Sequence, residues 1–597
     1  PFSLGELINT ITDHYNLNLD IPMEELLTLV LQNAEQEFQA DFHEGYWTDH
    51  WTYNLDLIES YLAVYPDKKE YLLFEDCSYC FYDSEMCVNP RDKKHVISNG
   101  KPFQLNAIFE NEAKKAMITS RTDFPNLLRI QNGKGKIYKT SLISKLFLLA
   151  LIKFSTSDPG GMGIEMEAGK PGWYDAMNGL PGLFGSSMPE TFELKRLLEF
   201  IVSVSGEFPS HRLEIPLEAN ALLDAVLCCL KVFMESDSNN RDFIYWDSVS
   251  SARENYRYQI QFGFDGQEIS IALQKLSEVL KQFIHKIDKG IKRALDLNSG
   301  LPPTYFYYQV DRFKYVKNVE LQPETDSNGH PYIRVEKFTP VILPLFLEGF
   351  VRALKVNPPD RVKTLYEKVK TSDLFDQKLK MYKVNESLEN QPHELGRARA
   401  FTPGWLENES IWLHMEYKYL LEVLKAGLYD QFFDDFKNVL IPFLDAERYG
   451  RSPTENSSFL VSSAHPDSRL HGVGFVARLS GSTAEFLSIW FIMMAGKTPF
   501  FMKDGQLHLQ FKPILPGWLF NADGMLSFCF LGNCWVTYHN PLKKNTYIES
   551  VSTQKVILQI KGTNPIEIPG GLIPSYLAEM VRCGEISKID IFLQSNP

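Results

Sequence analysis

Segments with apolar residues at helical spacing recur along most of this chain, and this recurrence limits the possible folds more than any other feature. Residues three and four positions apart share one face of a helix, so such spacing predicts amphipathic helices. The expected helices are 4–16, 22–40, 55–63, 141–154, 189–202, 217–234, 269–297, 340–354, 413–426, 429–444 and 483–495. So many helices, separated by Gly-, Pro- and His-rich loops, suit one large helical barrel whose loops carry the chemistry.

The pattern changes near Lys497, where the sequence becomes typical of strands. Apolar and polar residues alternate, or short β-type runs stand between Gly, Pro and Asn turns. The expected strands are 506–510, 528–531, 534–539 and 556–560. We therefore expect a helical lead-in over 1–40, a large helical domain over 41–498 and a β-rich C-terminal domain over 499–597.

Composition excludes several classes of function. The 597 residues carry a formal net charge of −14 without a basic stripe, so we expect no nucleic-acid partner. The longest apolar run, around 486–496, is shorter than the roughly 20 residues that cross a membrane, so we expect no membrane association. The eight cysteines are sparse for this length, and reduced thiols suit a cytoplasmic protein.

Three of the cysteines, Cys77, Cys80 and Cys87, form a C-x2-C pair with a third cysteine nearby. A zinc site built on them needs a fourth ligand. No clear fourth ligand follows in the sequence, so no metal site is expected.

A loop rich in glycine and proline, 169–187, carries one carboxylate next to aromatic side chains. Trp173 and Tyr174 precede Asp175, and a helix follows the loop. Glycine lets the backbone approach a ligand closely, and an acid beside apolar rings has a raised pKa, as a proton donor to a sugar needs. The competing interpretation is a tight connection between helices in which Asp175 caps a local turn.

A second polar and aromatic cluster lies at 43–54, just before the expected helix 55–63. It contains two His, two Trp, two Tyr and two acidic residues, among them Trp47, Asp49 and His50. Such clusters line ligand pockets. The alternative is an aromatic helix start with satisfied histidines.

Two later segments carry polar groups at the starts of expected helices. Residues 397–414 place Glu407 after a Pro-Gly turn and His414 at the head of an apolar helix, although a lone His there is often a core residue. In Leu-Ser-Gly-Ser-Thr at 479–483, Ser482 and Thr483 precede another helix. Hydroxyls and free backbone N–H groups at a helix start bind anions, and simple N-capping is the alternative.

These segments, in this order, resemble motifs of the inverting glycoside phosphorylases related to cellobiose phosphorylase. Trp-Tyr-Asp-Ala-Met-Asn at 173–178 resembles W-N-D-G-M-N, and 397–414 resembles R-x-x-x-F-x-P-G-x-x-E-N-x-x-I-F-x-H. Residues 479–482 resemble L-T-G-T, and 537–541 resemble a C-terminal strand motif. Asp-His-Trp-Thr-Tyr-Asn at 49–54 is similar to the large β-glucan phosphorylases, especially those acting on β-1,3-gluco-oligosaccharides.

The resemblance implies an (α/α)6 barrel with a C-terminal jelly-roll-like domain, mainly α in class. It implies an enzyme that cleaves β-glucosidic bonds of gluco-oligosaccharides with inorganic phosphate as co-substrate and no cofactor, giving α-glucose 1-phosphate reversibly. Asp175 is then the general acid. The implied phosphate ligands are His414, Ser482 and Thr483, and the implied sugar ligands are Asp49, Trp47, His50, Trp173 and Glu407. A homodimer is expected.

The chain departs from the family pattern in three places. The Arg-Asp pair that precedes a helix in the family is matched here only by Asp49, and 35–44 contain no arginine for the phosphate. Arg399 and Arg478 are alternative sources of that cation. The N-terminal β-sandwich of the relatives has no counterpart, so we expect either a fragment or a partner domain on another chain.

Two other functions stay open. An inverting hydrolase on the same barrel would use Glu165 or Glu167 as the base and would release reducing sugar without phosphate. A non-catalytic carbohydrate-binding subunit would bind oligosaccharide without turnover. The segments around His414 and Ser482 favour the phosphorylase, because a hydrolase needs no anion site.

Overall fold

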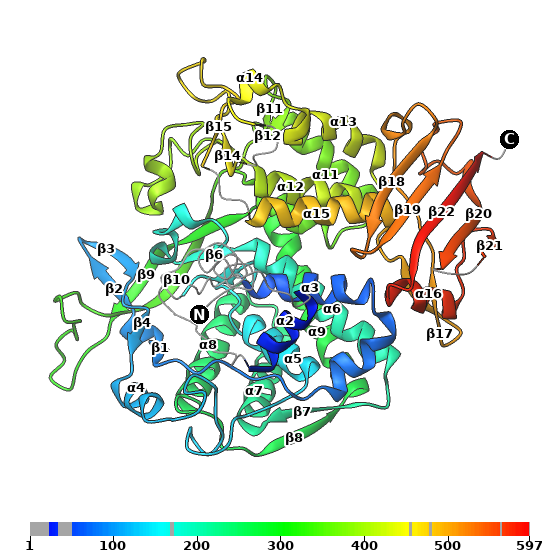
Figure 1. The fold of residues 1–597 in the computed structure, drawn as a ribbon. Helices are drawn as coiled ribbons and strands as arrows, with labels where there is room; N and C mark the ends of the chain where they lie inside the picture. Colours follow the sequence, from blue (N-terminus) through cyan, green and yellow to red (C-terminus); the bar gives the residue numbers. More distant parts are fainter. Residues whose placement is uncertain are drawn as a thin grey trace, which may run out of the picture. The chain divides into compact units, whose positions relative to one another are not determined.

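The computed structural model describes residues 23–33, 50–167, 172–452, 457–476, 480–560 and 564–595. The chain divides into two compact units, one made of Pro1–Tyr46 with Thr122–Phe124 and the other of Trp47–Arg121 with Pro125–Pro597. In the first unit the described element is the helix α2 (Met23–Asn33). All other elements belong to the second unit (Figure 1).

The architecture is mixed α/β, with 43% helix and 22% strand. The strands form many small separate sheets, and the described residues contain no closed barrel. The expectation of a mainly α (α/α)6 barrel with a jelly-roll-like domain is therefore wrong. Helical spacing located helices, but it carried no information on the strands between them, which pair with partners far away in the sequence.

One group of helices packs around a core of aliphatic and aromatic side chains. Within it the rings of Phe154 and Phe283 stack with their centroids 3.9 Å apart. The main helices of this group are α5 (Leu142–Phe154), α6 (Met188–Glu207), α7 (Leu217–Glu235), α8 (Arg241–Gln259) and α9 (Leu273–Leu297).

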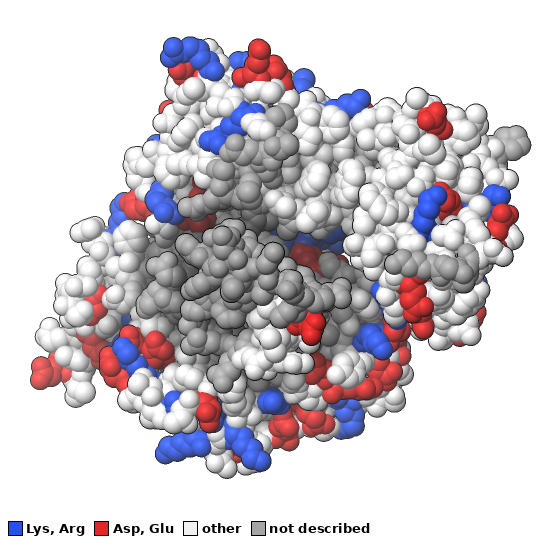
Figure 2. Space-filling view, in the orientation of Figure 1, with Lys and Arg blue, Asp and Glu red and all other residues white. Residues whose placement is uncertain are grey.

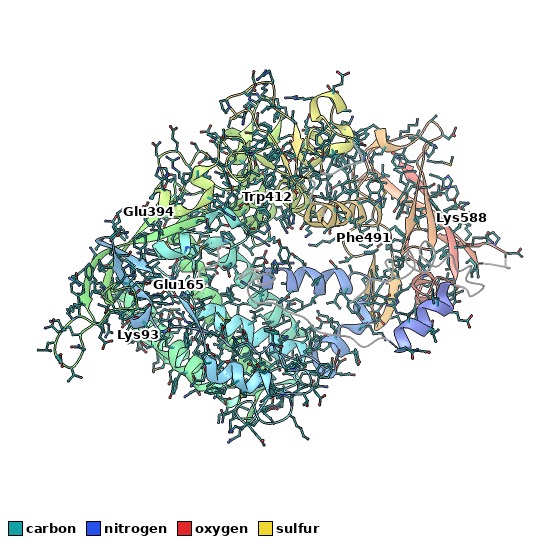
Figure 3. All side chains as sticks on the ribbon, turned by 60° about the vertical axis from the view of Figure 1, so that its left-hand side comes forward. Lys93, Glu165, Glu394, Trp412, Phe491 and Lys588 are labelled. Carbon is teal, nitrogen blue, oxygen red and sulfur yellow. The ribbon has the colours of Figure 1, made fainter. Side chains whose placement is uncertain are left out.

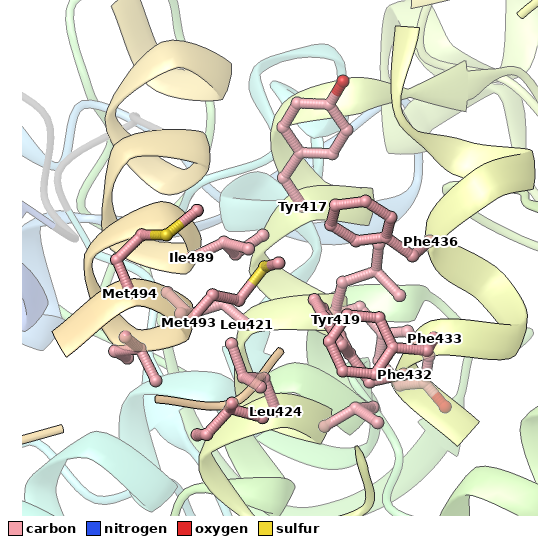
Figure 4. Close-up of a cluster of buried hydrophobic side chains, with 14 of the residues drawn as sticks. Tyr417, Tyr419, Leu421, Leu424, Phe432, Phe433, Phe436, Ile489, Met493 and Met494 are labelled. Carbon is pink, nitrogen blue, oxygen red and sulfur yellow. The ribbon is translucent and has the colours of Figure 1, made fainter. Parts of the chain in front are cut away.

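A second group of helices shares its core with the C-terminal strands. Figure 4 shows its centre, where Tyr417 and Leu421 of α12, Phe432 and Phe436 of α13, and Met493 of α15 meet. The helices concerned are α10 (Leu347–Leu354), α11 (Pro359–Thr371), α12 (Leu413–Lys425), α13 (Tyr429–Val439) and α15 (Ser480–Ala495).

The largest sheet has the order β18-β19-β22-β20-β21, in which only the pair β19 and β22 is parallel. Its strands are β18 (Met525–Phe530), β19 (Cys534–His539), β20 (Val551–Ile560), β21 (Ile566–Pro569) and β22 (Ile586–Ser595). Side chains alternate across it, so that Val536 and Tyr538 are buried while Trp535 is 56% exposed. This alternation is the reason that the C-terminal strands were visible in the sequence.

Two smaller sheets hold the loops that carry the candidate site. A four-stranded sheet has the order β10-β9-β6-β5 and a three-stranded sheet the order β13-β14-β15. Their strands are β5 (Ile164–Glu165), β6 (Gly185–Ser187), β9 (Tyr305–Tyr315), β10 (Ile333–Ile342), β13 (Ile411–Trp412), β14 (Phe459–Leu460) and β15 (Gly474–Phe475).

The remaining strands form two-stranded sheets. They are β1 (Met86–Val88) with β4 (Ile108–Glu110), β2 (His95–Ser98) with β3 (Lys101–Gln104), β7 (Arg212–Pro216) with β8 (Glu268–Ala272), β11 (Phe375–Asp376) with β12 (Met381–Tyr382), and β16 (Phe500–Lys503) with β17 (Gln506–Leu509). The remaining α-helices are α3 (Tyr53–Leu62), α4 (Glu112–Thr119), α14 (Ala446–Tyr449) and α16 (Ser575–Arg582).

Two predicted helices begin later than expected, because their first residues are strand. The segment 340–354 starts with the end of β10, and α10 begins only at Leu347. The segment 269–297 starts within β8, and α9 begins at Leu273. In both, an apolar residue that suited the helical pattern instead pairs in a ladder.

The described helices include none with both the length and the apolar character that crossing a membrane requires. On the face shown in Figure 2, basic and acidic side chains of the described residues are interspersed. The domain boundaries expected at residues 40 and 498 stay predictions.

Candidate active site

The turn that carries Asp175 is anchored by the side chain before it. Tyr174 is fully buried, and its hydroxyl has two acceptors for its one hydrogen, Oδ1 of Asn385 at 2.9 Å and the carbonyl oxygen of Glu407 at 2.5 Å. Asp175 then begins the 3-10 turn Asp175–Met177. A buried aromatic with a satisfied hydroxyl fixes the backbone of the next residue, so Asp175 has a defined position.

Glu407 lies against this same turn. The backbone N–H of Ala176 donates to Oε2 of Glu407 at 2.7 Å. Burial raises the pKa of Glu407 to about 7, the charge of Asp175 adds to the rise, and the Ala176 bond and Arg397 oppose it. A carboxyl with a pKa near 7 is about half protonated at pH 7, and its protonated form can donate a hydrogen bond as well as accept one.

The segment of Arg397 closes over the other side of the turn. The backbone N–H of Arg397 donates to Oδ1 of Asn178 at 3.0 Å, and its Nη2 donates to the carbonyl oxygen of Asp175 at 3.3 Å. The preceding Gly396 has a φ of +124°, and a Cβ there would lie 2.5 Å from Oδ1 of Asn178. Only glycine therefore allows these two segments to approach so closely.

An aromatic wall links the Asp175 turn to the start of α12. The rings of Trp173 and Trp412 lie 4.3 Å apart, and Trp412 ends β13 immediately before α12 (Figure 3). Trp173 also meets the His414 ring edge-on at 5.4 Å. Flat rings of this kind can stack on the apolar face of a sugar.

The first turn of α15 packs directly against His414. A Cβ at Gly481 would lie 2.2 Å from Nδ1 of His414, so only glycine fits there. Ser482 is buried and Thr483 is exposed. The structure therefore places Gly481, the residue before Ser482, against His414 at a helix N-terminus.

The electrostatics around His414 involve two residues that the sequence analysis missed. Nε2 of His414 lies 3.6 Å from Oε1 of Glu485, which pairs with Nζ of Lys418 at 2.7 Å. Burial lowers the pKa of His414, and Lys418 adds to this while Glu485 opposes it. Burial also opposes the charge of Glu485, yet Lys418 and His414 bring its pKa to about 2. Neutral His414 thus faces a carboxylate already balanced by a lysine.

Of these two residues, only Lys418 had a signal in the sequence, which was its spacing from His414. Lys418 follows His414 by four positions on α12, so the two share a helix face. Glu485 lies within the first two turns of α15, five residues after its start. Their pairing depends on how α12 and α15 pack together, which no local pattern encodes.

The remaining predicted sugar ligands fall in or beside the 43–54 cluster. Trp47 and Asp49 lie outside the described residues. His50 is exposed in the 3-10 turn His50–Thr52, with its ring 6.1 Å from that of Tyr53. Nζ of Lys418 lies 4.5 Å from the Tyr53 ring, so the start of α3 lies on the His414 side of the site.

Arg399 and Arg478 are the two arginines considered as phosphate ligands. Arg399 donates through Nε to the carbonyl oxygen of Gln391 at 3.1 Å and through Nη2 to that of Glu389. It is thus engaged within its own loop. Arg478 lies outside the described residues.

The two glutamates considered as a hydrolytic base are held in buried ion pairs. Nη2 of Arg253, which is 1% exposed, lies 3.0 Å from Oε2 of Glu165 and 2.7 Å from Oε1 of Glu167. Arg257 also pairs with Glu167 at 2.6 Å. Although burial opposes its charge, Arg253 and Arg257 bring the pKa of Glu167 well below its usual range.

A cavity of about 880 Å³ adjoins the His414 side of the site. Its charged wall includes Lys418, Glu485 and Arg352, and its apolar wall includes Phe491 of α15, labelled in Figure 3. Neither Asp175 nor Glu407 lines this cavity.

Other predicted features are placed as follows. His539, in the fourth motif, pairs with Asp590 at 2.9 Å within the large sheet. The described residues contain no group of three or more side chains that could hold a metal ion.

No protein-family model matches this chain, and no curated protein matches it significantly. The resemblance to glycoside phosphorylases therefore stays an expectation that rests on the four motifs.

Proposed function

We propose that this protein catalyses the reversible, inverting phosphorolysis of β-glucosidic bonds in gluco-oligosaccharides. The observation that carries the proposal is the convergence of three separate segments. The Asp175 turn binds Glu407 through Ala176, Trp173 contacts His414, and His414 contacts Gly481. One patch thus holds an acid pair, aromatic rings and a helix N-terminus beside a neutral histidine.

In the proposed reaction, Asp175 in its protonated form donates its proton to the glycosidic oxygen. The bond from C1 to that oxygen breaks, and an oxygen of inorganic phosphate forms the new bond to C1 from the opposite face. The products are α-glucose 1-phosphate and a shortened oligosaccharide. Glu407 holds sugar hydroxyls, and Trp173 stacks on the ring.

The phosphate would lie between His414 and the first turn of α15. The Ser482 hydroxyl and the backbone N–H groups at this helix start are donors of the kind that bind an anion. The nearby carboxylate of Glu485 is paired with Lys418 at 2.7 Å, so it does not repel the phosphate as a bare charge would. Thr483 is exposed at the same helix start.

The hydrolase is the weaker alternative. Its base would have to be an available carboxylate, but Glu165 and Glu167 are both paired with the buried Arg253. A base held by two arginines, as Glu167 is, has little tendency to take a proton from water. A non-catalytic carbohydrate-binding subunit is the other alternative, and the acid pair of Asp175 and Glu407 argues against it.

The test is phosphate release from α-glucose 1-phosphate with a panel of gluco-oligosaccharide acceptors. Acceptor-dependent release would support the proposal, and the best acceptor would identify the linkage. Reducing sugar formed from β-glucans in phosphate-free buffer, without such release, would instead support the hydrolase. Binding of oligosaccharide without either activity would support the binding subunit.

A further inference from the structure

A second cavity, of about 680 Å³, lies where α12 and α15 end. Lys425, the last residue of α12, and Ala495, the last of α15, both line it. The first turns of the same two helices carry His414 and Ser482. At 1.5 Å per residue, helices of this length separate the cavity from the candidate phosphate site by about 20 Å.

The lining of this cavity is cationic and rich in hydroxyl groups. It includes three lysines, and none of the described residues that line it is Asp or Glu. The polar lining side chains are Lys425, Lys497, Lys512, Thr498, Gln510, Thr546, Ser552, Thr553, Tyr429 and Tyr547. A concave site of this size with a few polar groups suits a small ligand.

Two of the three lysines are available to a ligand. Lys425 pairs with Glu422 at 3.0 Å, whereas Lys497 and Lys512 form no ion pair within the described part of the chain. The Tyr547 hydroxyl donates to Oδ1 of Asp430, which is outside the lining, at 3.4 Å. The cavity therefore keeps an excess of positive charge.

The position of Lys512 is fixed by close backbone packing. Its N–H donates to the carbonyl oxygen of Ala495 at 3.1 Å. Gly496 has a φ of +92°, and a Cβ there would lie 3.1 Å from Cβ of Lys512. A lysine at a helix C-terminus also stabilises the helix dipole. Stabilisation of the helix dipole explains single lysines at the C-termini of α12 and α15. It does not require that they line a cavity that is rich in hydroxyl groups and has no carboxylates in its lining.

We propose that this cavity binds the phosphate group of a phosphorylated sugar. Lys497 and Lys512 would pair with the phosphate oxygens, and the hydroxyls of Thr498, Ser552 and Thr553 would hydrogen-bond the sugar. The tyrosine rings add flat apolar surface for the sugar ring. This cavity shares Lys425, Lys497 and Thr498 with the 880 Å³ cavity, but it lies about 20 Å from His414 and Ser482, and the proposal does not depend on the proposed reaction.

The test is isothermal titration calorimetry with glucose 6-phosphate. The parent protein is compared with the double variant Lys497→Met, Lys512→Met, which keeps the apolar stems and removes both charges. The control is Lys281→Met, Lys503→Met, which removes two exposed lysines elsewhere and changes net charge equally. We expect at least tenfold weaker binding in the cavity variant and unchanged binding in the control.

Titration with inorganic phosphate separates the contribution of the phosphate group to binding from that of the sugar. Equal affinity for inorganic phosphate would assign the binding to the phosphate group alone, and weaker affinity would assign part of it to the sugar. Both results support a phosphate site. Equal affinity of the parent and the cavity variant for glucose 6-phosphate, equal loss in the control, or no binding by the folded parent would overturn it.

Discussion

The backbone N–H of Ala176 donates a 2.7 Å hydrogen bond to Oε2 of Glu407, a residue 231 positions away in the chain. This bond places a carboxyl with a pKa near 7 next to the turn that carries Asp175. Two acids that share one site do not ionise independently, because the charge of one disfavours the charge of the other. A single polar contact therefore defines the acid pair of the candidate site.

Substituting Asp175 by Asn should remove the proton donor and leave the turn intact, since the Asp175 contact with Arg397 uses a backbone oxygen. We expect phosphate release from α-glucose 1-phosphate to fall on the order of 10²–10⁴-fold. Thermal unfolding of the variant should match that of the parent. Undiminished release would remove Asp175 from the role of general acid.

Substituting Gly481 by Ala tests His414 without removing any predicted phosphate ligand. The new Cβ would lie 2.2 Å from Nδ1 of His414 and must displace the ring. We expect the apparent KM for phosphate to rise about tenfold, a loss of about 1.4 kcal/mol in binding. The control is Gly206→Ala in α6, where a Cβ would meet nothing within 4 Å.

Gly481→Ala and Gly206→Ala should differ in their apparent KM for phosphate only if His414 and the first turn of α15 hold phosphate. A Gly481→Ala protein with the phosphate KM of the parent would show that His414 is structural. His414→Ala should repeat the phosphate effect of Gly481→Ala, because both change the same contact.

Substituting Gly396 by Ala should destabilise the protein by forcing the Arg397 segment away from the Asp175 turn. We expect a loss of about 2–4 kcal/mol, from backbone strain plus the contact with Asn178. Gly427→Ala is the matched control, because Gly427 also has a positive φ but a Cβ there would meet nothing within 4 Å. It should lose only about 1 kcal/mol. Urea unfolding measures both, and equal losses would mean that the close approach to Asn178 is unimportant.

Glu407 should make the stability depend on pH. Its pKa rises from 4.5 to about 7 on folding, so the folded protein keeps a proton that the unfolded chain releases. The stabilisation is full below pH 4.5 and is lost as the pH rises through 7, by about 3 kcal/mol in total.

Glu407→Gln isolates this contribution, because glutamine does not titrate. The difference in unfolding free energy between the parent and the variant should fall as the pH is raised from 5 to 8, measured by urea unfolding. A difference that does not change with pH would mean that Glu407 is ionised throughout.

Substituting Glu167 by Ala should show that this residue is structural. The change leaves the buried Arg253 with one partner fewer, and we expect a loss of about 3–5 kcal/mol in unfolding free energy. The partly exposed pair of Lys93 and Glu324 is the comparison, since Glu324→Ala should cost less than about 1 kcal/mol. If Glu167→Ala kept full stability and abolished release of reducing sugar, the hydrolase would regain support.

Periodicity predicted the helices well where one face is uniformly apolar, and it failed where a buried face is polar. The segments 141–154 and 217–234 correspond closely to α5 and α7. In contrast, α8 was missed, because its buried face includes Arg253, which is neutralised by Glu165 and Glu167 from another element. A pattern of apolar residues within one segment cannot include the glutamates that neutralise Arg253, because they are 86 or more residues away in the sequence.

The strands show the same division. The alternation in 534–539 predicted β19 because one face of the large sheet is buried and the other is not. The long strand pair β9 and β10 was missed, and the mixed α/β class of the fold was missed with it. Both strands depend on pairing between segments far apart in the chain, since β9 also pairs with β6.

Local chemistry was enough to nominate Asp175, Glu407, His414 and Ser482, since a glycine-rich turn, an acid after Pro-Gly and a hydroxyl at a helix start are visible in a few residues. Packing alone placed Glu407 on the amide of Ala176 and Gly481 against His414. It also paired Lys418 with Glu485, a contact that no local pattern encodes. The physical reason is that a pattern of neighbours reports which groups a segment offers, while their distances and charges depend on segments that only folding brings together.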